Sequence, residues 1–489
     1  MSEKPDRPRP ASPLDPADWS AFRREAHALL DQAIDKLEHA ADGPVWRPMP
    51  AEVRARLAIP APLDPTPVES VRAELVESIL PYATGNTHPR FWGWVHGTGT
   101  PGGVLAEMAA AAMNANCGGR NHGAIELERI VVGWACSWFG LPAGAGGLLI
   151  SGSSMANLYG IALARHHKAG HDVRAQGNNG APLVAYTSAE AHLSVSKAFE
   201  LLGLGRDALR SVPVGADFAL DLAALRTAIA TDRAAGKKPF CVIASTGTVN
   251  SGAFDDLAAL ADLCAAEALW LHVDGAFGAL VALAPELKHR IAGIERADSI
   301  AFDFHKWLHV PYDSGCILVR DQALQTAVFG GRPDYLASIG GMASGEPWPS
   351  DLGIELSRGF RALKVWWTLR EQGTRRLGEA ILRNCAQARL LESLLRGHPA
   401  IEIAAPVGLN IVCCRYRAAG LDDAAHDALN ARIVVTIQES GAAVTSSCRI
   451  GGRLCIRVCI TNHRSADVDF NLLADTIIST GAKLSATIR

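Results

Sequence analysis

The middle of the chain shows the clearest pattern, in which short apolar runs alternate with alanine-rich segments that favour helix. Six runs recur between about residue 145 and residue 320, and we expect each of them to be a strand: GLLIS (147–151), LVAYTS (183–188), FCVIAST (240–246), WLHVDG (270–275), SIAFDF (299–304) and GCILVR (315–320). Apolar strands alternating with helices predict an α/β fold, with a mostly parallel central sheet covered by helices on both faces. Ligands of such sheets bind at the carboxyl ends of the strands, so polar residues just after these runs are the candidate site.

The flanking segments carry different patterns. Residues 1–16 are rich in proline and polar residues, and we expect them to be disordered. Apolar positions at helical spacing predict helices over about 18–40 and 68–80, which we interpret as an N-terminal helical arm that packs on a second subunit. After about residue 375 a long helix precedes shorter strands, which predicts a small C-terminal α+β domain. We therefore divide the chain into a tail and arm (1–85), a large domain (86–375) and a small domain (376–489).

Composition narrows the class of protein. Hydrophobic residues make up 48% of the chain and charged residues 20%, as in soluble globular proteins. The 47 basic and 50 acidic residues leave a net charge of −3, so neither nucleic acid nor an anionic membrane is an expected partner. Eleven scattered cysteines without a CxxC pair, and an amino terminus without the apolar core of a signal peptide, favour the reducing cytoplasm. The histidines of HHKAGH (166–171) fit a solvated helix end, and no metal is expected.

A lysine directly after an apolar run is the most informative residue. Lys306 stands in DFHKW (303–307), between a histidine and a tryptophan. An amine that forms imines must lose its proton, which desolvation and nearby cationic groups favour. The alternative is a lysine whose ammonium group simply reaches water from the edge of the sheet.

An aspartate ends another apolar run. Asp274 closes WLHVD and is followed by Gly275 and Ala276. A buried carboxylate needs a cationic partner, and the protonated nitrogen of a pyridine ring would be one. That contact makes the ring an electron sink, as pyridoxal chemistry requires. The alternatives are a helix cap and an ion pair with an arginine.

Three further features stand at strand ends. The serines of SGSS (151–154) open a helix and suit a phosphate group, although serines at such positions commonly only cap helices. His192 follows LVAYTS and could stack on a flat ring or only satisfy a turn, and Thr246-Gly247-Thr248 offers hydroxyl groups to the same crevice. Taken together, these residues and Lys306 predict that the chain holds pyridoxal 5′-phosphate as a Schiff base and acts on amino acids.

The chain also resembles a known family. Eight segments carry the likeness over nearly its whole length: NTHPRFWGW (86–94), AIELERIVVGW (124–134), SGSSMAN (151–157), SAEAHLSVSKA (188–198), WLHVDGAFG (270–278), DFHKW (303–307), LSRGFRALKVWW (356–367) and ITNHRSADVDF (460–470). They resemble the group II pyridoxal-phosphate decarboxylases, which include the aromatic-L-amino-acid, histidine and glutamate decarboxylases. The resemblance implies the fold type I of pyridoxal-phosphate enzymes, which is the aspartate-aminotransferase type, and a homodimer with active sites at the subunit interface.

The resemblance also implies roles for single residues. Lys306 would bind the cofactor covalently, Asp274 would contact the pyridine nitrogen and His192 would stack on the ring. The other expected cofactor contacts are Ser153, Ser154, Thr246 (or Ser245), Ala276, Asp303 and His305. Asp303 stands where the aromatic decarboxylases usually have asparagine, which leaves its part open.

The implied reaction is loss of carbon dioxide from an L-amino acid to give a primary amine. In the family a tyrosine on a mobile loop is implicated in returning a proton to the α-carbon, and Tyr335 in GGRPDYLASIGG matches it. Relatives with phenylalanine there make aldehydes by oxygen-dependent deamination. The alternatives are therefore an aldehyde synthase or another carbon–carbon lyase on the same scaffold and, more distantly, a non-catalytic relative.

The expected substrate pocket departs from that of the aromatic decarboxylases. The segment that would reach the site from the partner subunit carries polar groups at Asn114, Asn116, Arg120 and His122. Trp94 (or Trp92) and His96 would form the other wall, with Arg358 near the substrate carboxylate. Arg120 could instead pair with Glu126 or Glu128. Polar groups suit a polar or acidic side chain better than a plain phenyl ring, so the substrate is left as an aromatic or polar amino acid.

Overall fold

The computed structural model describes residues 14–331, 340–345 and 347–487 of the chain. Its centre is a seven-stranded sheet of strand order β1-β7-β6-β5-β4-β2-β3. Only β7 runs antiparallel to its neighbours. The strands are β1 (Gly146–Ile150), β2 (Leu183–Ser188), β3 (Leu209–Val212), β4 (Lys238–Ser245), β5 (Trp270–Asp274), β6 (Ser299–Asp303) and β7 (Gly315–Val319). All six expected strands are present, and the mostly parallel sheet is confirmed.

The strand that the pattern did not reveal is β3. It lies at the edge of the sheet, pairs only with β2, and has one buried residue in the sequence LRSV. An edge strand with so little burial has no apolar run to mark it.

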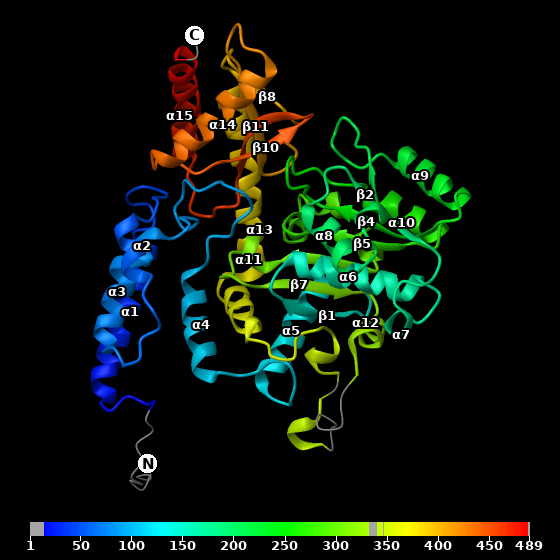
Figure 1. The fold of residues 1–489 in the computed structure, drawn as a ribbon, viewed down its shortest axis with the longest axis horizontal. Helices are drawn as coiled ribbons and strands as arrows, with labels where there is room; N and C mark the ends of the chain where they lie inside the picture. Colours follow the sequence, from blue (N-terminus) through cyan, green and yellow to red (C-terminus); the bar gives the residue numbers. More distant parts are fainter. Residues whose placement is uncertain (1–13, 332–339, 346, 488–489) are drawn as a thin grey trace.

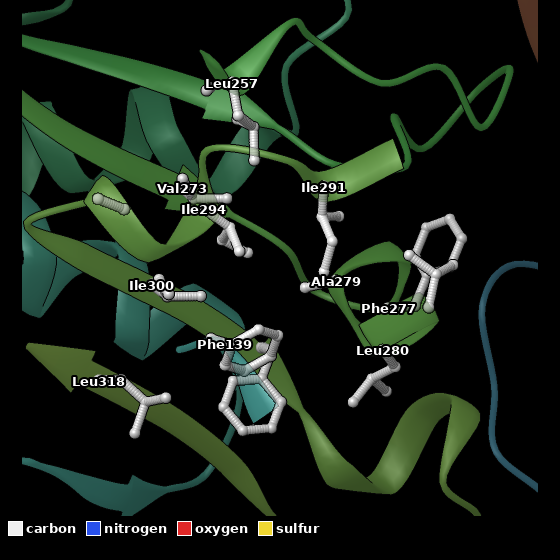
Figure 2. Packing of buried hydrophobic residues seen from close by; sticks show 14 of the residues in the cluster. Phe139, Leu257, Val273, Phe277, Ala279, Leu280, Ile291, Ile294, Ile300 and Leu318 are labelled. Atoms are coloured by element: carbon white, nitrogen blue, oxygen red, sulfur yellow. The ribbon is translucent and has the colours of Figure 1, made fainter. Parts of the chain in front are cut away.

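Helices cover both faces of the sheet, as predicted. Alternate strand residues point to opposite faces and form two separate cores. On one face lie α6 (Ser153–Lys168), α8 (Leu193–Leu201) and α12 (Gln322–Phe329); the other face carries α5 (Gly123–Trp138), α9 (Leu222–Ala234) and α10 (Leu257–Ala266). Figure 2 shows part of this second core, where Phe139, the residue after α5, lies near Ile300 of β6 and Leu318 of β7. The short helices α7 (Val173–Gln176) and α11 (Phe304–Trp307) lie in connections.

The N-terminal arm consists of α1 (Trp19–Glu38), α2 (Ala51–Leu57) and α3 (Val68–Ser78), of which α2 was not predicted. Figure 1 shows the arm on the side of the molecule away from the large sheet, with α4 (Pro101–Met113) and α13 (Arg361–Arg396) between them. None of the residues of α1 is buried in the single chain, and Trp19, Phe22 and Ile34 are exposed. The arm therefore leaves apolar surface open in one chain.

The C-terminal part is an α+β unit, as predicted. Gly373 breaks α13 with a non-helical φ of 72° and ψ of 151°, and the second half of the helix packs on a four-stranded antiparallel sheet of order β10-β11-β9-β8. Its strands and helices are β8 (Ile401–Ile403), β9 (Ile411–Tyr416), β10 (Ser446–Ile450), β11 (Arg453–Cys459), α14 (Asp423–Glu439) and α15 (Asp467–Ala486). The domain limits 1–85, 86–375 and 376–489 stay predictions. No helix in the described ranges is long and apolar enough to cross a membrane.

Candidate active site

Two adjoining cavities, each of about 320 Å³, open where the parallel strands end. Four residues line both cavities: His192, Asp274, Ala276 and Lys306. The cavity that we call the cofactor cavity continues to Ser153, Ser154, Asp303, His305 and Tyr312. The other, here the outer cavity, continues to Trp94, His96, Ser245, Asn250, Ser446, Ser447 and Arg457. Strand ends distant in sequence thus meet at one edge of the sheet, as the parallel topology requires.

Lys306 lies in the short helix α11, directly after β6. Its Nζ is 2.9 Å from Oδ2 of Asp303, and only 22% of its side chain is exposed. Trp307 anchors the helix, because it is fully buried and its indole N–H donates to Asn384 at 2.9 Å. Gly97 crosses directly over this helix, and a Cβ at that position would overlap the carbonyl oxygens of His305 and Lys306. The lysine therefore points into the site rather than into water.

Asp274 ends β5 with its carboxylate turned toward the cavities. It accepts hydrogen bonds from the side chain of Asn157 at 2.9 Å and from the backbone N–H of Ala276 at 3.2 Å. Within the described part of the chain no arginine or lysine forms an ion pair with it. A protonated ring nitrogen would supply the cationic partner that a buried carboxylate needs.

The start of α6 lines the cofactor cavity with the serines that were expected to contact a phosphate group. The hydroxyl group of Ser153, the first residue of α6, is buried and has no hydrogen-bond partner among the described residues. The Thr246 hydroxyl group is buried and unpartnered as well, but Thr246 follows β4 and lines neither cavity. His305 accepts a hydrogen bond from the backbone N–H of Ser314 at Nδ1 (3.0 Å), and burial lowers its pKa. An unpartnered hydroxyl group at a helix amino terminus fits a phosphate group, so Ser153, His305 and Lys306 together fit pyridoxal phosphate.

The sequence left the part of Asp303 open, and the structure shows which groups its carboxylate contacts. Its Oδ1 accepts the backbone N–H of Ser153 at 2.7 Å, while Oδ2 faces the ammonium group of Lys306. A carboxylate repels a phosphate at close range. Asp303 is therefore suited to orienting Ser153 and Lys306 rather than to touching phosphate.

His192 caps the amino end of α8 and lines both cavities. Its Nδ1 accepts the backbone N–H of Ser194 at 3.2 Å and lies 2.8 Å from the Ser194 hydroxyl. Burial is the main cause that lowers its pKa. A neutral imidazole ring at this place is able to cover a flat cofactor.

The wall of the outer cavity includes both predicted and unpredicted residues. Trp94 and His96 line it, as expected, whereas Trp92 is buried in the C-terminal core. Burial and the charge of Lys306 lower the pKa of His96.

Arg457 of β11 was missed from the sequence. It is 3% exposed, and its guanidinium group donates to the carbonyl oxygens of Val249 (2.7 Å) and Trp94 (3.0 Å). Its Nη2 is buried without a partner in the described ranges, where no carboxylate pairs with it. The signal in the sequence was a charged residue inside the apolar run RLCIRVC. Tyr312, whose ring stacks on His305 with centroids 4.3 Å apart, was missed as well.

Five expected substrate residues line neither cavity: Asn114, Asn116, Arg120, His122 and Arg358. The side chain of Arg358 is fully buried in an ion pair with Glu128, 2.6 Å away. Arg120 lies over the ring of Trp348 at 4.7 Å and, among the described residues, pairs with neither Glu126 nor Glu128. The expectation that residues 114–122 reach the site of a second subunit stays a prediction, and Tyr335 lies outside the described residues.

Comparison with known proteins agrees with this geometry. Residues 50–417 match the pyridoxal-dependent decarboxylase conserved domain. The aromatic-L-amino-acid decarboxylase of Bacillus atrophaeus is 33% identical over 449 residues, which are 91% of this chain and 92% of the relative. The mouse enzyme of the same name is 30% identical over 92% of this chain and 96% of its own length.

Solved structures give the same result. The Oryza sativa TDC with PLP and tryptamine superposes with a TM-score of 0.88 at 28% identity, covering 96% of this chain and 99% of that chain. The 4-hydroxyphenylacetaldehyde synthase of Rhodiola rosea superposes with a TM-score of 0.85 at 26% identity, covering 96% and 99%. The expected fold type, cofactor and enzyme class are confirmed. The chain belongs to the family of pyridoxal-phosphate-dependent amino-acid decarboxylases.

Proposed function

We propose that Lys306, Asp274 and His192 form the catalytic centre of an L-amino-acid decarboxylase whose main substrates carry an aromatic side chain. One observation carries the proposal: Lys306, an aspartate without a cationic partner among the described residues and the unpartnered hydroxyl group of Ser153 meet at one strand-end cavity. Each group matches one part of pyridoxal phosphate. Two relatives are named aromatic-L-amino-acid decarboxylases, which supports decarboxylation as the reaction.

The residues divide the work. Asp274 would hold the proton on the ring nitrogen of the cofactor, and His192 would cover the ring. The Ser153 and Ser154 hydroxyl groups and His305, with the amino end of α6, would hold the phosphate, while Asp303 keeps Ser153 and the Lys306 amine in place. When bound, pyridoxal phosphate supplies the electron sink that stabilises the electron pair left by carbon dioxide. Tyr335 returns a proton to the α-carbon.

The cofactor attachment has a direct test. Borohydride reduction of the parent enzyme should fix a pyridoxyl adduct on Lys306, located by peptide mass spectrometry. The Lys306→Ala variant should bind the cofactor without forming the adduct. An adduct on another lysine would contradict the assignment.

The substrate proposal rests on the wall of the outer cavity. Trp94 and His96 offer flat surfaces to a ring, and the curated relatives in the comparison include aromatic-amino-acid and tryptophan decarboxylases. The second candidate is a substrate with a polar or acidic side chain, favoured by the unpaired cation of Arg457 beside Ser446 and Asn250. Carbon dioxide release from each proteinogenic amino acid separates the two candidates.

Arg457 provides a sharper test of the same question. Arg457→Met should raise KM for every substrate if the cation holds the α-carboxylate, and only for acidic substrates if it holds the side chain. Arg415→Met is the matched control, because Arg415 is equally buried in the same sheet but pairs with Asp427 at 2.5 Å. The control should lower unfolding stability and leave KM unchanged. If KM is unchanged in Arg457→Met, Arg457 does not bind the substrate and has only a structural role.

The proposed functional unit is a cytoplasmic homodimer in which the arm and residues 114–122 meet a second copy. The open apolar surface of α1 supports the dimer, and the finding that the polar residues of 114–122 line neither cavity of their own chain supports a shared site. Sedimentation of the full chain should give a dimer, and deletion of residues 1–40 should weaken it. A monomeric, fully active enzyme would refute the shared site.

A further inference from the structure

A chain of buried polar side chains runs beneath the cofactor cavity and joins β5 and β6 to α6 and α8. It begins at Trp270 and ends at two residues of the site, Asp274 and His192. The members between these ends are Ser299, His272, Asn157 and Ser194. Ser299, His272 and Asn157 line neither cavity, whereas Ser194 lines the cofactor cavity.

The far end of the chain contains a neutral histidine. The Trp270 indole N–H donates to the Ser299 hydroxyl at 2.9 Å, and that hydroxyl lies 2.8 Å from Nδ1 of His272. His272 is completely buried, and burial lowers its pKa to about 4. A neutral imidazole has one nitrogen that donates and one that accepts.

Asn157 determines which nitrogen donates. Its Nδ2 is 2.9 Å from both Oδ2 of Asp274 and the Ser194 hydroxyl, while its Oδ1 is 2.9 Å from Nε2 of His272. An ionised carboxylate only accepts, so the amide N–H groups must face Asp274 and Ser194. Nε2 of His272 therefore carries the proton, and Nδ1 accepts from Ser299.

The same reasoning about donors and acceptors assigns the proton on the His192 ring. The Ser194 hydroxyl accepts from Asn157, which leaves its own proton to donate to Nδ1 of His192 at 2.8 Å. The backbone N–H of Ser194 points at the same nitrogen. The neutral His192 ring consequently carries its proton on Nε2.

A glycine in α6 is a second, independent sign that the His272 ring has to occupy this position. Gly160 lies over the imidazole ring, and a Cβ there would overlap its Nδ1 and Cε1 atoms. Glycine in a helix interior costs roughly 0.5–1 kcal/mol relative to alanine. The glycine is useful despite this cost because it leaves room for the imidazole ring of His272 beside α6.

We propose that His272 and Asn157 are positioning residues of the decarboxylase site. By fixing the amide of Asn157, His272 holds Asp274 ready for the ring nitrogen and sets the proton of His192 on Nε2. The inference rests on the proposed roles of Asp274 and His192 and adds two residues that act through them.

The test compares three variants with the parent enzyme. His272→Leu removes the donor and leaves Oδ1 of Asn157 without a partner. His272→Gln restores one donor and one acceptor. Tyr186→Phe is the matched control, because it removes another buried hydrogen bond of the same sheet, from the Tyr186 hydroxyl to Asp232 at 3.1 Å.

Three quantities are measured for each protein: the Kd of the apoprotein for pyridoxal phosphate by fluorescence titration, the urea midpoint of unfolding, and kcat with KM. We expect His272→Leu to raise Kd roughly tenfold or more and to lower kcat, as loss of a buried donor implies. His272→Gln should recover most of both. Tyr186→Phe should lower only the urea midpoint.

Two results would overturn the inference: His272→Leu with a Kd within about twofold of the parent, or a folded His272→Gln as defective as His272→Leu. If His272→Leu does not fold, Gly160→Ala takes its place, since it displaces the ring while leaving the imidazole present. Failure of the parent enzyme itself to attach the cofactor at Lys306 would refute the proposed function instead.

Discussion

The buried ion pair between Arg358 and Glu128 gives a prediction that separates structure from substrate binding. Both oxygens of Glu128 accept from the guanidinium group, at 2.6 and 3.0 Å. Arg358 also donates to the carbonyl oxygens of Cys117 and Leu149, and Glu128 accepts the backbone N–H of Leu149 at 3.0 Å. The pair thus ties α5 to β1 and to the segment that precedes α13.

The expected cost of breaking the pair follows from burial. Glu128→Ala leaves the fully buried guanidinium group with only the longer contact to Glu355, 3.9 Å from its Nε, which should lower the free energy of unfolding by about 3 kcal/mol, the low end of the range for a broken buried pair. Arg358→Met should cost a similar amount. The double variant Glu128→Ala/Arg358→Met should lose less than the two single changes together, because neither charge of the pair is left, although the backbone groups of Cys117 and Leu149 lose partners.

Urea unfolding of the four proteins, at saturating pyridoxal phosphate, measures the coupling, and kcat and KM are measured on the same preparations. We expect the urea midpoints to fall in both single variants and KM to change little in Glu128→Ala. The reasoning is refuted if Glu128→Ala keeps the parental midpoint, or if Arg358→Met raises KM strongly without loss of stability. The second result would restore Arg358 as a substrate ligand.

Three further predictions concern the site and its pH dependence. Tyr335→Phe should divert product toward aldehyde and hydrogen peroxide, measured by product analysis with a peroxide assay, and an unchanged amine yield would contradict the proton-donor role. Gly97→Ala should lower kcat because its Cβ overlaps the backbone of α11, whereas Gly133→Ala, with open space around it, should not; equal activity of the two variants would count against the close approach. The pKa of His272 is lowered to about 4 from 6.5 in the folded protein, so its contribution to stability is present above pH 6.5 and is lost as the pH falls toward 4. Between pH 7 and pH 5 the free energy of unfolding of the parent should therefore fall by about 2 kcal/mol more than that of His272→Gln. Burial raises the pKa of Asp255 to about 6, which acts in the opposite direction, but it does so in both proteins. Urea unfolding of both proteins at both pH values checks this prediction. If the difference between their free energies of unfolding does not change with pH, His272 does not titrate as stated.

Local sequence was sufficient wherever a polar residue directly follows a buried strand. Lys306, Asp274 and His192 were all found in this way, because parallel strands bring their carboxyl ends to one edge whatever the details of packing. The same reasoning missed Arg457, since a single arginine in a strand of another domain carries no local sign that it will line this cavity. It also placed Arg358 beside the substrate, where the structure shows an ion pair with Glu128.

The sequence by itself determined the alternation of strands and helices, the cofactor and the enzyme class. These depend on periodic burial and on short segments whose chemistry is complete within a few residues. Only the tertiary structure decided that Asp303 pairs with Lys306, that Asn157 and His272 lie beneath Asp274, and that Arg457 faces the outer cavity. Those contacts join residues from about 100 to more than 200 positions apart, except for the local pair of Asp303 and Lys306. Such long-range contacts depend on strand order and register, and the choice of partner for Asp303 depends on how α11 turns. Neither is expressed in the local pattern of apolar and polar residues.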